Sequence, residues 1–200
     1  MKKVIGLILA AGKSERMGSA KSLLRIQGKS FLEHIVIEAQ QSALNDFKIV
    51  LGHQAEQVLR SLPQLRSAVV INADYDQGQL SSLIRGLQSI KEPSVDGVML
   101  FLVDHPFVTH QLIDSLLQQF SRQPAPMVIP SYHGRRGHPM IFGRQLFPEL
   151  VTTPLDQGAT AVVRRHEPEI LYLDTEDEGI LIDIDTPEAY REYVIGRGFA

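Results

Sequence analysis

A glycine-rich loop that carries three cations follows the first apolar run of the chain. The run Val4–Leu9 is apolar throughout, which is typical of a central parallel strand with both faces covered. The loop after it reads Ala10-Ala11-Gly12-Lys13-Ser14-Glu15-Arg16-Met17-Gly18-Ser19-Ala20-Lys21. Exposed backbone N–H groups and cationic side chains can cradle the phosphates of a ligand. The loop therefore predicts a phosphate-binding site, with a turn bearing solvated cations as the alternative.

Two better-known phosphate loops do not fit this segment. A Walker A motif needs about four residues between its glycines, whereas five strand residues separate Gly6 from Gly12. The G-x-G-x-x-G spacing of a dinucleotide-binding loop does not occur in the sequence. A phosphate site here would therefore belong to another class of nucleotide-binding protein.

Two acidic segments are candidates for holding a metal ion. Asp104 directly follows the apolar run 98–103, and ligands bind beyond the carboxyl ends of parallel strands. Magnesium takes one or two carboxylates and keeps its other positions for phosphate oxygens and water. Asp185 is the second candidate, because alternation along residues 182–185 places Asp183 and Asp185 on one strand face. A turn or helix-cap role is the alternative for Asp185.

A basic turn, Gly134-Arg135-Arg136-Gly137-His138-Pro139, lies in the second half of the chain. Its two guanidinium groups are suited to bidentate phosphate binding, and its imidazole could serve as a hydrogen-bonding group. An exposed basic turn without a function is the alternative. We do not favour a zinc site from His133 and His138, because the nearby sequence offers no carboxylate or third histidine.

The elements that must position these residues alternate between strands and helices. Strand-like apolar runs lie at residues 4–9, 47–51, 68–71 and 98–103. Apolar residues at helical spacing lie at about 32–39, 80–90 and 112–120. Ser30 and Glu33 fit a capping box at the start of the first helix. This alternation predicts an α/β fold with a doubly wound, mostly parallel sheet and right-handed crossovers.

The pattern loosens after Pro124. Short strand-like pieces at 127–130 and 139–142 flank the polar turn, and they predict a hairpin or antiparallel excursion at the sheet edge. Late strands are expected at 170–173 and 180–184. Thr186 and Pro187 are expected to begin a final helix as its N-cap and first residue.

Composition excludes several classes of protein. The 200 residues, of which 44% are hydrophobic, predict a single domain over residues 1–200 with one core. A net charge of −3 argues against a nucleic-acid partner. The chain has no cysteine, so that a metal must use oxygen or imidazole ligands. No segment approaches membrane-spanning length, and we expect a cytoplasmic protein without a membrane partner.

Four motifs resemble those of the molybdenum cofactor cytidylyltransferases, and they occur in the family's order between residues 4 and 187. Leu9 to Lys21 is similar to L-A-A-G-x-S-x-R-M-G-x-x-K, with Ala20 where many members have proline. Asn72, Gly78 and residues 81–87 resemble N…G…S-S-L-x-x-G-L. The other matches are D-x-P at Asp104, D-I-D-T-P at 183–187 and G-R-R-G-H-P at 134–139.

This resemblance implies a Rossmann-like, three-layer α/β/α fold of the nucleotidyltransferase (GT-A-like) type, with a mostly parallel mixed sheet. It implies a magnesium-dependent enzyme that transfers CMP from CTP to a molybdopterin-type cofactor and releases pyrophosphate. Small-molecule substrates are the expected partners, and a molybdenum oxidoreductase is a further possible partner. An acceptor phosphate is already ionised at neutral pH, so no enzyme nucleophile is needed.

The resemblance also assigns residues. The implied catalytic residues are Arg16, Lys21 and Asp104, with Mg²⁺ on Asp104 and Asp185. The implied nucleotide-binding residues are Leu9, Ala10, Ala11, Gly12, Lys21, Asn72, Gly78 and Ser82. N-capping by Ser81 or Ser82 is a further, compatible role for these serines. The implied acceptor-binding residues are Arg135, Arg136 and His138.

Three alternatives remain open from the sequence. Methylerythritol-phosphate cytidylyltransferases share the L-A-A-G loop, but their long dimerisation arm is not evident here. Guanylyltransferases tend to have L-A-G-G, with glycine where this chain has Ala11. A non-catalytic chaperone could keep the fold and pass the pterin to an apo-enzyme, although the intact cations and acidic residues argue against lost catalysis.

Overall fold

A mostly parallel sheet forms the centre of the computed structural model, which describes residues 1–199. Its strand order is β10-β7-β9-β6-β1-β4-β5, with β8 paired to β7. The bounds are β1 Val4–Ala10, β4 Asp46–Leu51, β5 Val69–Ile71, β6 Gly97–Leu102, β7 Met127–Tyr132, β8 Arg135–Arg136, β9 Met140–Gly143 and β10 Ile170–Asp174. β2 (Arg25–Ile26) and β3 (Lys29–Ser30) form a separate antiparallel pair. β1 lies between β4 and β6 and is parallel to both.

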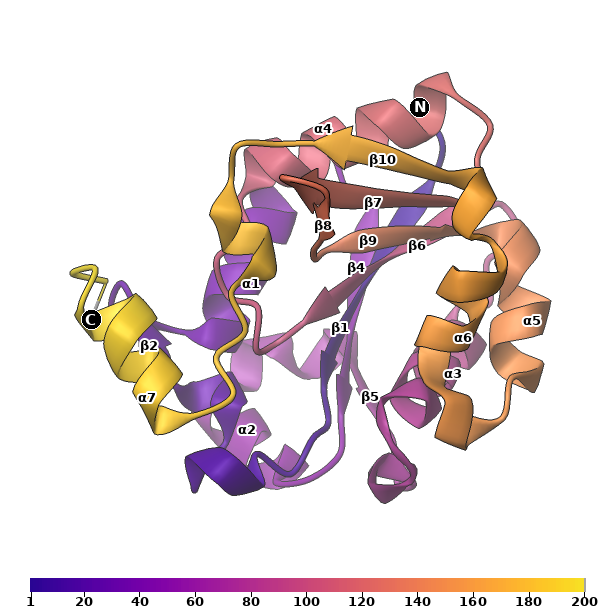
Figure 1. Cartoon of the computed structure of the whole chain (residues 1–200). Helices are drawn as coiled ribbons and strands as arrows, with labels where there is room; N and C mark the ends of the chain where they lie inside the picture. The colour runs from indigo at the N-terminus through magenta and orange to yellow at the C-terminus, as the bar shows by residue number, and fades with distance from the viewer. Residues whose placement is uncertain (200) are drawn as a thin grey trace.

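Helices cover both faces of this sheet (Figure 1). One face carries α1 (Phe31–Gln41), α2 (Ala55–Ser61), α4 (His110–Arg122) and α7 (Pro187–Tyr190). The other carries α3 (Gln79–Ser89), α5 (Phe147–Thr152) and α6 (Gly158–Arg165). Successive residues of β1 point to opposite cores, Ile8 to the first and Leu7 and Leu9 to the second. The predicted three-layer α/β/α fold is confirmed.

The antiparallel excursion lies inside the sheet, so the prediction of an edge position is wrong. β9 is hydrogen-bonded between β6 and β7 and is antiparallel to both, while β10 forms the edge. Ile141 and Phe142 explain the position, because both are fully buried and face opposite cores. Full burial of two successive side chains is typical of a strand in the interior of a sheet that is covered on both faces.

The expected strand at 180–184 is also wrong. The side chain of Asp177 accepts a hydrogen bond from Gly179 N at 2.8 Å and begins a 3₁₀ turn at Glu178–Leu181. The chain then runs extended, and Ile184 N donates to the carbonyl of Asp104 at 2.8 Å. Ile182 and Ile184 are buried as the alternation predicts, which leaves the aspartates between and after them facing outward.

Both predicted helix starts are confirmed. Ser30 and Glu33 form the capping box of α1, with Glu33 N donating to Ser30 Oγ at 3.2 Å. Thr186 caps α7, and a π-helical turn at Arg191–Ile195 continues it. Throughout residues 1–199, every helix is too short or too polar to cross a membrane.

A histidine clamp joins α5 to the end of α6 and gives a testable pH dependence of stability. His166 lies 2.7 Å from Glu149 and 2.8 Å from Glu169. Its hydrogen bond with Glu149, and then that with Glu169, raises the pKa of His166 above its ordinary value of 6.5. A group whose pKa is higher in the folded than in the unfolded state stabilises the fold. This contribution is fully present below the unfolded-state pKa and is lost as pH rises through the folded-state pKa.

We therefore expect the free energy of unfolding of the wild type to fall, relative to His166→Gln, as pH rises above about 6.5. The difference should be about 1 kcal/mol or less, because these groups are partly solvated. Urea unfolding of both proteins across this range measures it. Parallel pH profiles of the two proteins would show that the clamp does not contribute.

Candidate active site

A cavity of about 200 Å³ opens at the carboxyl ends of β1 and β6. Backbone and side chains of the loop after β1 form one wall, and the start of α3 and the end of β6 form the others. The predicted residues that line it are Leu9, Ala10, Ala11, Gly12, Lys21, Gly78, Ser82 and Asp104. The structure thus brings together residues that lie far apart in the sequence. Its position and lining suit the base and ribose of a nucleotide.

Asn72 is the predicted nucleotide-binding residue that lies behind this cavity. It is 3% exposed, and its Nδ2 donates to Ser81 Oγ at 2.9 Å and to Ser82 Oγ at 3.0 Å. Its Oδ1 accepts from Asp74 N at 3.0 Å. Asn72 therefore positions the serines of α3. The capping role considered for the serines is wrong, because the N-cap of α3 is Gly78, whose φ is 96°.

Sequence reasoning missed two aromatic rings in the cavity. His53 and Tyr75 both line it, with ring centroids 5.7 Å apart. His53 N donates to the carbonyl of Ala11 at 3.0 Å, which ties the end of β4 to the phosphate loop. A Cβ on Gly52 would lie 2.5 Å from that of Tyr75, so glycine is needed at this position. A glycine directly after a parallel strand was the signal that could have pointed to this wall.

A second cavity, of about 350 Å³, adjoins the first and contains the loop cations. Ser14, Lys21 and Tyr75 line both cavities, while Arg16 and Asp185 line the second. The loop is closed by a hydrogen bond of 3.2 Å from Lys21 N to Ser14 Oγ. This continuity can accommodate a base in the first cavity and a phosphate chain in the second.

The lysine of the loop lies between two acidic segments. Lys21 Nζ is 3.1 Å from Asp104 Oδ2, and it also forms an ion pair with Asp185. Arg16 pairs with the other oxygen of Asp185, and its side chain is 69% exposed. Asp185, expected as a metal ligand, thus contacts the two loop cations. Asp104 keeps a second carboxylate oxygen for another partner.

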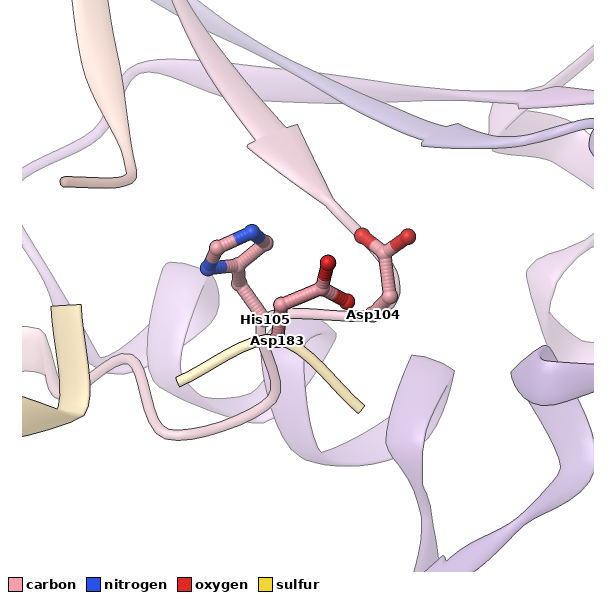
Figure 2. Close-up of side chains that lie close together, drawn as sticks. All are labelled: Asp104, His105 and Asp183. Carbon is pink, nitrogen blue, oxygen red and sulfur yellow. The ribbon is translucent and has the colours of Figure 1, made fainter. Parts of the chain in front are cut away.

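Asp104 lies together with His105 and Asp183 (Figure 2). One possible ligand atom from each residue lies within 4.8 Å of the other two. Loss of hydration raises the pKa of the Asp183 carboxyl, and the Asp104 carboxylate raises it further. Burial lowers the pKa of His105, opposed by the two carboxylates. A divalent cation would suit this arrangement, because it would neutralise the two acids and find a neutral imidazole beside them.

The basic turn is divided between three environments. Arg136 is paired with Glu167 and lies over the ring of Tyr172 at 5.6 Å. Arg135 lines a third cavity, of about 360 Å³, which also includes Asp183 and aromatic and charged groups of the C-terminal segment. These groups include Tyr132, Tyr193 and Arg197.

His138 packs under the acidic residues. Its ring centroid lies 4.8 Å from that of His105, whereas His133 contacts Tyr132. Burial, and then the neighbouring His105, lowers the pKa of His138 to about 3. The ring is therefore neutral near pH 7. The position of His138 suggests that it supports the His105 ring and does not contact an acceptor directly.

Comparisons with known proteins agree with this geometry. A family model described as the MobA-like NTP transferase domain matches residues 6–170. Purine catabolism protein PucB of Bacillus subtilis (strain 168) is 27% identical over 94% of this chain and 94% of its own. Nicotine blue oxidoreductase of Paenarthrobacter nicotinovorans is 28% identical over 92% of this chain and 93% of its own. A probable molybdenum cofactor guanylyltransferase of Bacillus cereus (strain AH187) is 29% identical over 68% of this chain and 66% of its own.

Solved structures show the same fold. Rv0371c from Mycobacterium tuberculosis H37Rv aligns with a TM-score of 0.86 at 26% identity, covering 96% of this chain and 98% of that one. A complex of Rv0371c with manganese aligns with a TM-score of 0.78 at 25% identity and the same coverage. The family model extends from β1 to the start of β10 and so includes the phosphate loop, Asp104 and the basic turn. The chain therefore belongs to the family of MobA-like NTP transferases.

Proposed function

We propose that this chain transfers CMP from CTP to a molybdopterin-type cofactor, releases pyrophosphate, and holds a divalent metal on Asp104 and Asp183. The observation that carries the proposal is the position of Lys21, which contacts Asp104 and Asp185 where the two cavities meet. Family membership supports nucleotidyl transfer, and a relative named as a molybdenum cofactor guanylyltransferase supports the acceptor. The preference for CTP rests on Ala11 and the resemblance of the motifs.

The proposed reaction needs in-line positioning and charge neutralisation. An acceptor phosphate oxygen forms a bond to the α-phosphorus of CTP as the bond to the β-phosphate oxygen breaks, and pyrophosphate leaves. Lys21 and Arg16 lie in the second cavity, where they would bind the pyrophosphate portion and stabilise the charge that grows on it. Ser82, held by Asn72, would contact the base in the first cavity.

The metal ligands in this proposal differ from those expected from the sequence. Asp183 replaces Asp185, because Asp183 lies with Asp104 and His105 while Asp185 is occupied by Lys21 and Arg16. A divalent metal would neutralise charge on the α-phosphate and orient it for attack. Asp185 would hold the two loop cations in place before the triphosphate arrives.

The third cavity is the proposed acceptor site. Asp183 borders this third cavity, and Asp104 borders the first cavity. The two carboxylates therefore lie between the proposed acceptor site and the proposed nucleotide site. Arg135 could bind the acceptor phosphate on that side. Arg136 and His138 are not part of this proposal as direct contacts, because one pairs with Glu167 and the other packs against His105.

A pyrophosphate-release assay with CTP, GTP, ATP and UTP, with and without molybdopterin, tests the activity. We expect release only with a metal and the pterin, and most rapidly with CTP. Tight nucleotide and pterin binding in equilibrium dialysis without turnover would favour the chaperone alternative. Release of pyrophosphate with GTP, and not with the other three nucleotides, would identify a guanylyltransferase. Copurification of a molybdenum oxidoreductase with this chain would support the expected protein partner.

Ala11→Gly tests nucleotide choice. Ala11 is 4% exposed and lines the first cavity, where its methyl group would narrow the space available to a purine. We expect the ratio of kcat/KM for CTP over GTP to shrink in Ala11→Gly without reversing, since one methyl deletion creates no new hydrogen bond to guanine. Steric exclusion can reject a larger base more strongly than a missing methylene rejects a smaller one, for which about 1–3 kcal/mol is the usual limit. Competition assays with both nucleotides measure this ratio, and equal use of CTP and GTP by the wild type would refute the cytidylyl assignment.

A further inference from the structure

The carboxylates proposed to hold the metal have an imidazole beside them. A ring nitrogen of His105 lies within 4.8 Å of a carboxylate oxygen from both Asp104 and Asp183 (Figure 2). Asp104 Oδ2 is engaged by Lys21 at 3.1 Å, which leaves the other Asp104 oxygen for a cation. The donor set on the protein is therefore two carboxylates and one imidazole.

The imidazoles of His105 and His138 do not use their full hydrogen-bonding capacity. Within residues 1–199, the Nδ1 atoms of His105 and His138 are both buried and have no partner at hydrogen-bond geometry. The backbone of Ile180 nevertheless lies near enough to the first ring, and that of Leu100 to the second, to raise the pKa of each against the lowering by burial. The two ring centroids lie 4.8 Å apart with their planes tilted by 49°, and His138 N donates to the carbonyl of Ile180 at 3.0 Å, which fixes the backbone of His138 beside His105. Buried polar atoms without partners are rare and often occur at functional sites. Apolar packing alone would not require two imidazoles here.

The identity of the third donor affects which cation binds best. Mg²⁺ prefers oxygen ligands in octahedral geometry and keeps several waters. Imidazole nitrogen favours first-row transition metals, while carboxylate and phosphate oxygens suit Mn²⁺ as well as Mg²⁺. A mixed site of two carboxylates, one imidazole and substrate phosphates therefore matches Mn²⁺ better than Mg²⁺.

We propose that His105 is a third protein ligand of the metal and that the site consequently selects Mn²⁺ over Mg²⁺. The inference rests on the proposed function, because it assumes that the Asp104–Asp183 site holds the catalytic metal. His138 would act as a positioning residue that holds the His105 ring against these carboxylates. The chain would then use a manganese-nucleotide complex as its preferred substrate form.

Metal binding to the purified protein tests this proposal without measuring activity. Mn²⁺ titrations followed by electron paramagnetic resonance, with Mg²⁺ as competitor, give both affinities. We expect Mn²⁺ to bind at least about tenfold more tightly than Mg²⁺. We expect His105→Gln to weaken Mn²⁺ binding about tenfold or more while changing Mg²⁺ binding much less. The matched control is His133→Gln, since this exposed histidine contacts Tyr132 and should not affect either metal.

Spin-echo modulation from ¹⁴N identifies the ligand directly. Manganese bound to the wild type should show imidazole ¹⁴N coupling that is retained in His133→Gln and lost in His105→Gln. Absence of this coupling in the wild type, or equal losses of Mn²⁺ and Mg²⁺ affinity in His105→Gln, would overturn the proposal. Circular dichroism and thermal melting of each variant separate ligand loss from unfolding.

The two proposals fail differently. Nucleotidyl transfer that depends on Asp104, without any ¹⁴N coupling, would refute the role of His105 and leave the proposed reaction standing. Nitrogen-coupled Mn²⁺ in a protein that transfers no nucleotide would refute the reaction and retain the metal ligand.

Discussion

Asp104→Asn is expected to reduce nucleotidyl transfer at least about a hundredfold, a typical cost of removing one preorganised electrostatic group at an active site. The carboxylate contacts Lys21 Nζ through one oxygen and lies with His105 and Asp183 in the proposed metal site. Asparagine keeps the size of the side chain but removes the charge on which both interactions depend. The rate of pyrophosphate release with CTP and the pterin acceptor measures the loss.

The fold should survive this substitution. The backbone carbonyl of Asp104, which accepts from Ile184 N, and the N–H of His105, which donates to Leu102, are unchanged in Asp104→Asn. Asp156→Asn is a matched control, because Asp156 is exposed in a 3₁₀ turn and lines none of the three cavities. A folded Asp104→Asn protein with the activity of this control would remove Asp104 from the mechanism.

The central part of the fold and site could be predicted from local patterns. Val4–Ala10 is apolar at every position because both faces of β1 are covered, and that pattern is visible in the sequence. Parallel strands bring their carboxyl ends to one edge, so the loop after β1 and Asp104 after β6 had to lie near each other. The Lys21–Asp104 contact is the physical result.

Features that depend on long-range pairing could not be predicted. The sequence placed Asp183 and Asp185 on one face, but which of them meets Asp104 depends on the hydrogen bond from Ile184 to the Asp104 carbonyl. Likewise, the two arginines of the basic turn are equivalent in sequence. Arg136 pairs with Glu167, 31 residues away, while Arg135 faces the third cavity.

The position of the antiparallel strands in the sheet could not be predicted for the same reason. The sequence pattern around 139–142 indicated a strand but did not give its neighbours. Only the tertiary structure shows that β9 lies between β6 and β7. His53 and Tyr75 were missed for a related reason, because their rings meet across a separation of 22 residues without a shared motif.

Lys21→Met is expected to lower kcat by about a hundredfold and to raise the KM for CTP by a smaller factor. Lys21 is 11% exposed on its side chain and contacts both Asp104 and Asp185. Methionine retains an unbranched apolar stem but leaves the two carboxylates without their shared cation. The substitution also removes the positive charge from the junction of the two cavities, where the leaving pyrophosphate is proposed to form.

The division of the effect between kcat and KM decides the role of Lys21. A cation that binds the ground-state triphosphate and the transition state equally would change KM alone, whereas one that responds to growing charge must change kcat. Lys91→Met provides the control. Lys91 is an exposed lysine that follows α3 in the sequence, and it lines none of the three cavities. Steady-state kinetics at saturating metal separate the two parameters. A rise in KM with an unchanged kcat would make Lys21 a uniform binding contact, and the charge on the departing pyrophosphate would then have to be stabilised by Arg16 and the metal alone.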